Sequence, residues 1–420
     1  MAVRRTVASA VLAFAAFGTF WGVWGASVPR VQDQAGLTDG QLGFALVFVG
    51  AGALPAMLVA GRALDRWGRA VVALTIAALG VSGAVVALTA VGVSSLSVGL
   101  ALVGASSGAA DVAINAVAGR AEKLAGRPVI TRAHGVFSAM VVVASLGCGL
   151  ASSASLPLAV PFVAAAVLCL VAALAVGTIR PPGGGGTPDL AAKPPDSNRP
   201  DTDAPDTAVP DTHALNADAP DAGPPIDGRP RTVPLLLLGV LGALAFASEN
   251  AHQSWSAVYV HAELGLGPGG AAVAPAVFAG TVALARFAAG GLGPAYARAV
   301  LVVGSSVAAA GATVMAVAPT FLVAALGLVL AAAGTAVLFP TLVGLVSRSV
   351  DERHRGRATS LVSTTSYLGF LLGPGYVGLW ADAVGLRGAM LAVAALAAVL
   401  CLLTPALLRL GGHGRLPALP

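Results

Sequence analysis

Long apolar segments recur along almost the whole chain, and they limit its possible folds more than any other feature. Of its 420 residues, 57% are hydrophobic and only 10% are charged. Charged side chains this scarce cannot cover a water-soluble globule of that size, so lipid must cover its surface instead. A helix needs roughly 20 apolar residues to cross about 30 Å of hydrocarbon. The sequence therefore predicts an all-helical, integral membrane protein.

Twelve segments reach this length. Their expected ranges are 6–28, 41–61, 70–92, 95–117, 132–153, 157–179, 233–257, 271–292, 298–317, 320–346, 358–380 and 387–408. A stretch rich in Pro, Gly and Asp separates the sixth segment from the seventh, and such a composition cannot bury enough apolar surface to offset its ordering entropy. We therefore expect an N-terminal six-helix bundle over 1–179, a disordered cytoplasmic linker over 180–232, and a C-terminal six-helix bundle with a short cytoplasmic tail over 233–420.

The placement of Lys and Arg predicts the orientation in the membrane. If the N-terminus lies inside, the inner loops hold most of these residues, whereas the outer loops hold only Arg30 and Arg387. Cytoplasmic loops carry such an excess of positive charge. We therefore expect a multi-pass protein of the cytoplasmic membrane with both termini in the cytoplasm. The net charge of +5 then reflects topology and attraction to anionic lipid, and it does not indicate a nucleic-acid partner.

The loop between the second and third predicted segments carries a distinctive pattern. It reads Gly61-Arg62-Ala63-Leu64-Asp65-Arg66-Trp67-Gly68-Arg69. Five of these positions match the G-x-x-x-D-R-x-G-R loop of the major facilitator superfamily, namely Gly61, Asp65, Arg66, Gly68 and Arg69. The chain resembles this family over nearly its whole length outside the linker. Residues 134–138 and 248–256 are further similar to the fucose-permease-like branch.

This resemblance implies two six-helix bundles with a transport site between them, near the middle of the membrane. It also implies that the matched loop acts as a conformational latch in the outward-open state. Gly61 would let two helices approach closely, and Asp65 could meet a helix N-terminus or a guanidinium group. The alternative is that the loop only anchors the protein by its positive charge, which explains the arginines but not Asp65 and both glycines.

Ionisable residues within apolar segments are the main site candidates, because a charge in hydrocarbon is costly without partners or water. In the fourth segment, Ser107, Asp111 and Asn115 recur every four residues and so share one helical face. We expect Asp111 to couple transport to protons or to bind substrate, and Asn115 to bind substrate. The alternative for Asp111 is a structural ion pair with an arginine such as Arg132.

The seventh segment carries a second group of polar residues, among them Glu249, Asn250, His252 and Trp255. At a rise of about 1.5 Å per residue, Glu249 is expected in the outer third of the membrane. A carboxylate there, beside an imidazole that titrates near neutral pH, could take up a proton from outside, so Glu249 and His252 are proton-coupling candidates. The alternative is that these groups only hydrate the end of the helix.

Aromatic residues on the segments that the resemblance places at the centre complete the expected site. Trp21, Trp24 and Trp255 could form stacking walls for a flat or sugar-like ligand, with Asn250 and Tyr367 as further substrate contacts. Tyr367 continues a hydroxyl-bearing stripe of the eleventh segment. Anchoring at the membrane interface is the alternative for Trp24 and Trp255.

Motifs for other classes of protein are missing from the sequence. It lacks a G-x-x-x-x-G-K-[ST] loop for ATP, and it lacks enzyme signatures and metal-ligand spacing. We therefore expect no enzyme, no cofactor and no metal, but a monomeric secondary active transporter whose partners are a small solute, protons and lipid. Its solute would be sugar-like or another polar metabolite, carried with protons by alternating access. The alternatives are proton-driven efflux of drugs or amphipathic metabolites and, less expected, a non-transporting membrane receptor or scaffold.

Overall fold

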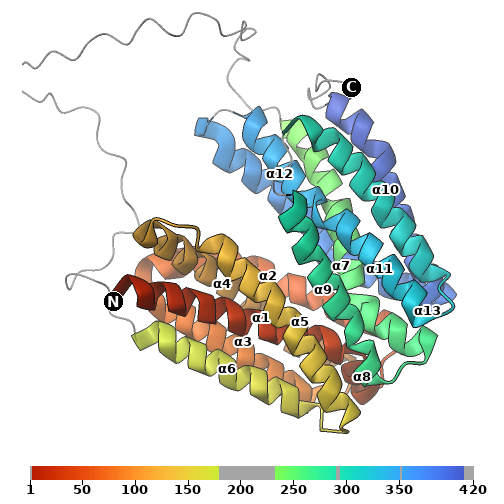
Figure 1. Cartoon of the computed structure of the whole chain (residues 1–420), viewed down its shortest axis with the longest axis horizontal. Helices are drawn as coiled ribbons and strands as arrows, with labels where there is room; N and C mark the ends of the chain where they lie inside the picture. Colours follow the sequence, from red (N-terminus) through yellow and green to blue (C-terminus); the bar gives the residue numbers. More distant parts are fainter. Residues whose placement is uncertain (1, 179–231, 290–293, 351, 411–420) are drawn as a thin grey trace, which may run out of the picture.

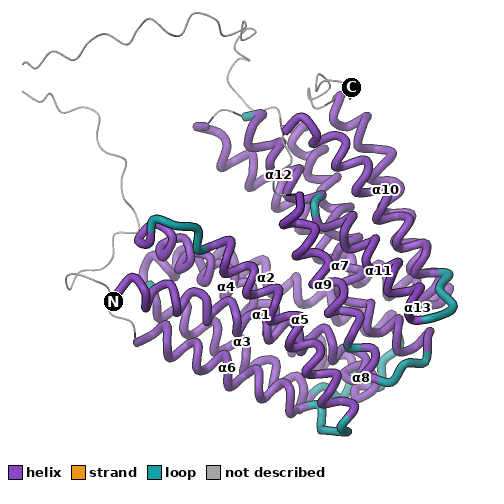
Figure 2. The backbone as a smooth tube through the Cα atoms, viewed as in Figure 1, coloured by secondary structure: helices purple, strands orange, loops and turns teal. Residues whose placement is uncertain are grey.

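The computed structural model describes residues 2–178, 232–289, 294–350 and 352–410, and the regular elements in these ranges are all helices. Short loops join them (Figure 2). Their bounds are α1 Ala2–Ala35, α2 Asp39–Trp67, α3 Arg69–Thr89, α4 Val93–Ala125, α5 Ile130–Ser153, α6 Ala159–Thr178, α7 Thr232–Leu264, α8 Pro268–Ala271, α9 Val273–Ala289, η1 Pro294–Tyr296, α10 Ala297–Ala316, α11 Phe321–Ala336, α12 Leu338–Ser349 and α13 Glu352–Leu410. The predicted linker falls on residues 179–231, which lie outside the described residues.

The number of membrane crossings agrees with the prediction of twelve. Eleven helical stretches among the described residues are long and apolar enough to span a membrane, and the last of them is Arg357–Leu410. Within it Gly385 has φ 77°, a conformation that residues with a Cβ avoid, so the backbone breaks there into two crossings. The predicted segments 271–292 and 320–346 each correspond to two consecutive helices, α8 with α9 and α11 with α12.

The helices form two groups that meet at one end of the molecule. Helices α1–α6 make up one group and α7–α13 the other, and the two groups diverge toward the end where the chain termini lie (Figure 1). Contacts between the groups involve α13 against α2, and α5 against α8 and α9. We call the end where the groups diverge the terminal end and the opposite end the closed end.

Hydrogen bonds between the two groups hold the closed end together. The Asp382 carboxylate of α13 accepts a hydrogen bond from the Gly40 amide at 2.8 Å and another from the Thr38 hydroxyl at 3.3 Å. These donors belong to the first turn of α2, whose amide groups lack partners within the helix. Close by, His261 of α7 lies 3.7 Å from the Asp33 carboxylate of α1. These contacts therefore join the two helix groups at the closed end.

Glycines bring the two groups into backbone contact just inside these hydrogen bonds. A Cβ added to Gly43 of α2 would lie 2.8 Å from the Cα of Gly378 in α13. Helices that pack in lipid commonly use small residues in this way, because dispersion contacts and not water exclusion drive their association. Gly43 and Gly378 thus place α2 and α13 close enough together to form one wall of the central cavity.

Candidate functional site

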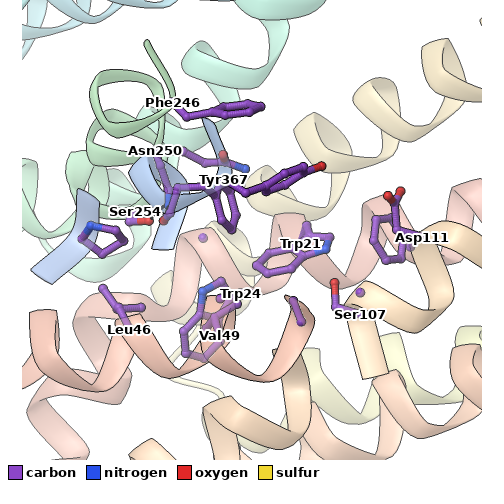
Figure 3. Close-up of a pocket in the computed structure, with 18 of the residues that line it drawn as sticks. Trp21, Trp24, Leu46, Val49, Ser107, Asp111, Phe246, Asn250, Ser254 and Tyr367 are labelled. Carbon is purple, nitrogen blue, oxygen red and sulfur yellow. Dashed lines mark hydrogen bonds between the residues drawn. The ribbon is translucent and has the colours of Figure 1, made fainter. Parts of the chain in front are cut away.

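A cavity of about 250 Å³ lies between the two helix groups, with walls from α1, α2, α4, α5, α7 and α13 (Figure 3). Most of its surface is apolar or aromatic, and a few polar side chains interrupt it. The lining residues are Phe17, Trp21, Trp24, Gly25, Leu46, Val49, Gly50, Ala53, Met57, Ser107, Gly108, Asp111, Phe137, Phe246, Asn250, Gln253, Ser254, Tyr367, Phe370 and Pro374. Five residues that the sequence predicted are brought together here, namely Trp21, Trp24, Asp111, Asn250 and Tyr367.

Four phenylalanines of the cavity wall were missed by the sequence reasoning. These are Phe17, Phe137, Phe246 and Phe370. Phe246 contacts Tyr367 with ring centroids 5.4 Å apart, and Phe17 contacts Phe137 at 5.7 Å. Helical spacing could have found three of them, because each shares a face with a predicted residue. Phe17 lies four residues before Trp21, Phe246 four residues before Asn250, and Phe370 three residues after Tyr367.

Asp111 lies in the cavity wall because α4 packs tightly against α2. Gly104 and Gly108 of α4 lie against the backbones of Val49 and Ala53, where a Cβ would collide with a carbonyl oxygen. Asp111 follows about one turn later on that face and lines the cavity. Among the described residues no Lys or Arg pairs with its carboxylate. The predicted alternative, an ion pair with Arg132, is therefore not formed in this structure.

Asn115 supports Asp111 and does not line the cavity. Its Nδ2 donates to the Asp111 carboxylate at 3.1 Å and to the Asp111 carbonyl at 2.9 Å. Its Oδ1 accepts a hydrogen bond from the Nε2 of His134 on α5, at 3.2 Å. In this conformation the amide of Asn115 holds Asp111 and His134, and its expected contact with substrate stays a prediction.

Glu249 belongs to an ion pair between α7 and α9. Its carboxylate lies 2.8 Å from the guanidinium of Arg286, and its side chain is only 12% exposed. The Nε of Arg286 also donates to the Ala336 carbonyl at the end of α11, at 3.1 Å. Helix α7 has 33 residues and ends at Leu264, beyond the predicted end at 257, so Glu249 lies near the middle of the helix. Its expected place in the outer third of the membrane stays a prediction. Its pairing with Arg286 also differs from the hydrated helix end that was the alternative.

Two other predicted residues of α7 are fully buried and lie away from the cavity. The Nδ1 of His252 donates to the Ser248 carbonyl at 2.8 Å, and its ring stacks against Phe278 of α9. Trp255 is also wholly inaccessible. Residues one position apart on a helix differ by about 100° in direction, so Trp255 points away from the cavity that its neighbour Ser254 lines. His252 and Trp255 thus do not reach the cavity in this conformation, and their expected roles in proton uptake and substrate binding stay predictions.

Asn250 is the predicted residue of α7 that does line the cavity. Its Nδ2 donates to the Phe370 carbonyl of α13 at 2.7 Å. Ser254, one turn later, donates to the Asn250 Oδ1 at 3.0 Å. These bonds tie α7 to α13 and fix the orientation of the Asn250 amide beside Tyr367 (Figure 3).

The predicted latch loop lies at the terminal end, where the two helix groups are apart. Helix α2 ends at Trp67, and Gly68 makes the turn with φ 55° before α3 begins at Arg69. Asp65 and Arg66 are exposed, and the Arg66 guanidinium lies 5.5 Å from the centroid of the Trp67 ring. A Cβ on Gly61 would meet open space, so the expected close helix approach at Gly61 is absent from this conformation. The latch itself stays a prediction.

Comparison with known proteins identifies the fold. The sequence profile described as Major Facilitator Superfamily matches residues 9–294 and again residues 238–418. A mutant of the nucleoside transporter NupG has a similar structure, with a TM-score of 0.72 at 12% identity over 96% of this chain and 99% of that one. A bacterial homolog of the human lysosomal transporter Spinster, inward-facing and unoccupied, gives a TM-score of 0.70 at 16% identity over 100% and 99%.

A third similar structure is the inward-open xylose transporter XylE from E. coli, with a TM-score of 0.66 at 13% identity over 96% of this chain and 95% of that one. At these identities the likeness concerns the fold alone. A search among curated proteins returned no match.

Proposed function

This chain belongs to the major facilitator superfamily and is therefore a multi-pass membrane transporter and not an enzyme, and we propose that it carries a small organic solute coupled to protons. The solute would occupy the cavity between the helix groups and cross by alternating access. The observation that carries proton coupling is the Asp111 carboxylate, which lines this cavity without a basic partner among the described residues.

Asp111 suits proton coupling because its charge is costly in an apolar cavity. A buried carboxylate needs a cation, strong hydrogen bonds or a proton, and the described hydrogen bonds come only from Asn115. When the cavity is open to water at the terminal end, Asp111 can exchange protons with it. When the groups close around the cavity, the neutral acid is the less costly form, so a proton would cross with the conformational change.

Two solute classes draw support from different parts of the cavity wall. Ser107, Gln253 and Ser254 offer hydroxyl and amide groups, which suit a sugar-like or other polar metabolite. The aromatic wall suits an amphipathic solute, since seven of the lining residues are Phe, Trp or Tyr. Import of the first class and efflux of the second are both compatible with proton coupling through Asp111.

Glu249 is a second proposed coupling group. It lies near the middle of α7 and its partner Arg286 is on α9, so a proton on Glu249 would weaken the tie between these helices. Because Glu249 does not line the cavity, it would act through helix movement and not through contact with the solute.

Reconstituted liposomes test the proposed function. The purified full chain is placed in vesicles that contain a pH-sensitive dye, with the membrane potential clamped at zero, and sugars, polyols and amphipathic amines are added in turn. We expect one solute class to drive proton movement that protein-free vesicles lack. Labelled solute that moves without any proton movement would overturn proton coupling and leave a uniporter.

Asp65→Asn tests the latch with the solute that this screen identifies. Asp65 has no ion-pair partner among the described residues of this conformation, so its contacts would form only when the terminal end closes. Losing a charge-assisted hydrogen bond of about 1.5–3 kcal/mol in one state should slow turnover by roughly tenfold or more and leave equilibrium binding within about twofold. Initial rates of counterflow are compared with binding to the purified protein.

Arg62→Gln is the matched control for Asp65→Asn, because it removes a charge at the same membrane surface outside the matched pattern. It should change turnover by less than about twofold. Equal losses of binding and turnover in Asp65→Asn would contradict the latch.

A further inference from the structure

The cavity has an unbalanced charge. Of the described residues that line it, Asp111 is the single acidic one, and none of them is Lys, Arg or His. A solute site that must hold an anion would need a basic or strongly donating group in its wall. The wall instead offers one carboxylate, which attracts positive charge and repels anions when it is ionised.

The nearest basic side chains are already engaged elsewhere. His134 donates to the Asn115 Oδ1, which separates its ring from the Asp111 carboxylate. Arg286 binds Glu249 and the Ala336 carbonyl, and neither Arg286 nor Glu249 lines the cavity. In this conformation the protein itself therefore supplies no countercharge to Asp111, and the solute or a proton must do so.

The aromatic wall is suited to the same kind of solute. The faces of Trp and Tyr rings carry negative charge density and attract cations within about 6 Å. Figure 3 shows Trp21 lying between Trp24 and Asp111, with Tyr367 above it. Asp111 and Tyr367 line the same cavity from opposite helix groups. An ammonium group at Asp111 would thus lie beside two aromatic rings.

Polar groups that a sugar would need are partly used within the protein. Asn250 donates to the Phe370 carbonyl, and its Oδ1 accepts from Ser254. A solute with many hydroxyl groups requires a partner for each one that it removes from water. The cavity volume of about 250 Å³ is also small, since pockets for drug-sized ligands hold roughly 300–1,000 Å³.

We infer that the solute is a small organic cation, with its ammonium group held between Asp111, Trp21 and Tyr367 and its apolar part against Phe246 and Phe370. This inference rests on the proposed function and adds the charge and size of the solute to it. Neutral sugars of similar size could donate hydroxyl hydrogen bonds to Asp111 but would leave its charge without a countercharge, and organic anions would be repelled by it.

Three probes of one shape and different charge test the inference, namely phenethylammonium, phenethyl alcohol and 3-phenylpropionate. Binding to the purified full chain in detergent at pH 7 is followed by tryptophan fluorescence, because Trp21 and Trp24 line the cavity, and by calorimetry. We expect phenethylammonium to bind at least about tenfold more tightly than the alcohol, with 3-phenylpropionate weakest.

Two variants at Asp111 assign the preference to its charge. Asp111→Asn should bring phenethylammonium within about twofold of the alcohol, whose unchanged binding reports an intact cavity. Asp111→Glu keeps the charge and should keep the preference for the ammonium probe. A wild-type protein that binds phenethylammonium no better than the alcohol overturns the inference, and so does an unchanged preference in Asp111→Asn.

These measurements use no proton gradient, so they are independent of the proposed proton coupling. A neutral solute that drives proton movement in liposomes would contradict the assignment of a cationic solute but would agree with proton coupling. Transport of a cation without proton movement would contradict proton coupling but would agree with the assignment of a cationic solute.

Discussion

Replacing Asp111 with Asn is expected to reduce solute-driven proton movement to the level of protein-free vesicles. The substitution changes the size of the side chain very little and leaves an oxygen that can accept the hydrogen bond from Asn115. It removes the single carboxylate among the described residues of the cavity wall, which offers no other acidic or basic side chain to carry the proton. Proton movement is read from the internal dye, and exchange of labelled solute from counterflow on the same vesicles.

Counterflow separates the two possible reasons for a loss of proton movement. If Asp111 carries only the proton, exchange of a neutral solute should persist in Asp111→Asn, because exchange needs no net proton transfer. If the solute is a cation, exchange should fall as well. Asp111→Glu is the control, since it retains a titratable carboxylate and should retain proton movement. Full proton movement in Asp111→Asn would assign the coupling to another residue.

Arg286→Gln is expected to cause the second large effect, a loss of stability that a second substitution reverses. The Glu249 carboxylate is 12% exposed, so removing Arg286 leaves a buried charge without its partner. Breaking a buried pair costs roughly 3–5 kcal/mol, and because the Arg286 side chain is 47% exposed we expect about 1–3 kcal/mol here. Thermal unfolding in detergent should therefore begin at a lower temperature in Arg286→Gln than in wild type.

The double variant Glu249→Gln/Arg286→Gln is the informative control. It replaces the ion pair by two neutral amides, which can hydrogen-bond each other, and it should unfold at a temperature between those of Arg286→Gln and wild type. A double variant no more stable than Arg286→Gln would show that the two side chains do not act as a pair. Proton movement in a stable double variant then decides the role of Glu249, because its loss would make Glu249 a coupling group.

The sequence predicts the fold well because membrane thickness sets a minimum length for each apolar segment that crosses it. It predicts the ends of the helices less well, since nothing in lipid thickness stops a helix from continuing into water. Helix α7 continues to Leu264 through the polar residues His261 and Glu263, so Glu249 lies near the middle of a longer helix than the predicted one. The predicted position of Glu249 along the helix therefore depended on where α7 ends, and hydropathy does not specify that end.

Some residues of the candidate site can be predicted from the sequence of a single helix. Others can be predicted only when it is known which two helices pack together. Asp111 could be predicted because a carboxylate in an apolar membrane segment is energetically costly and therefore indicates a functional site. The Glu249–Arg286 pair could not, because spacing within α7 does not tell which neighbouring helix each face meets. Helix α7 also misled the prediction, since its stripe of Ser248, His252 and Ser256 is buried and the cavity face is a different one.

The contact between Gly43 and Gly378 bears on how well this transporter could preserve a proton gradient if it is proton-coupled as proposed. A carrier that lets water molecules form a continuous file between its helices would allow protons to hop along that file and waste the stored energy. An added methyl group does not fit between the two glycine backbones, because it would lie 2.8 Å from the Cα of Gly378. A water molecule is about as large as a methyl group and needs a space of roughly 10–15 Å³ of its own. Where Gly43 meets Gly378, the barrier to water and proton leakage is thus the backbone itself, which no change of side-chain rotamer can open.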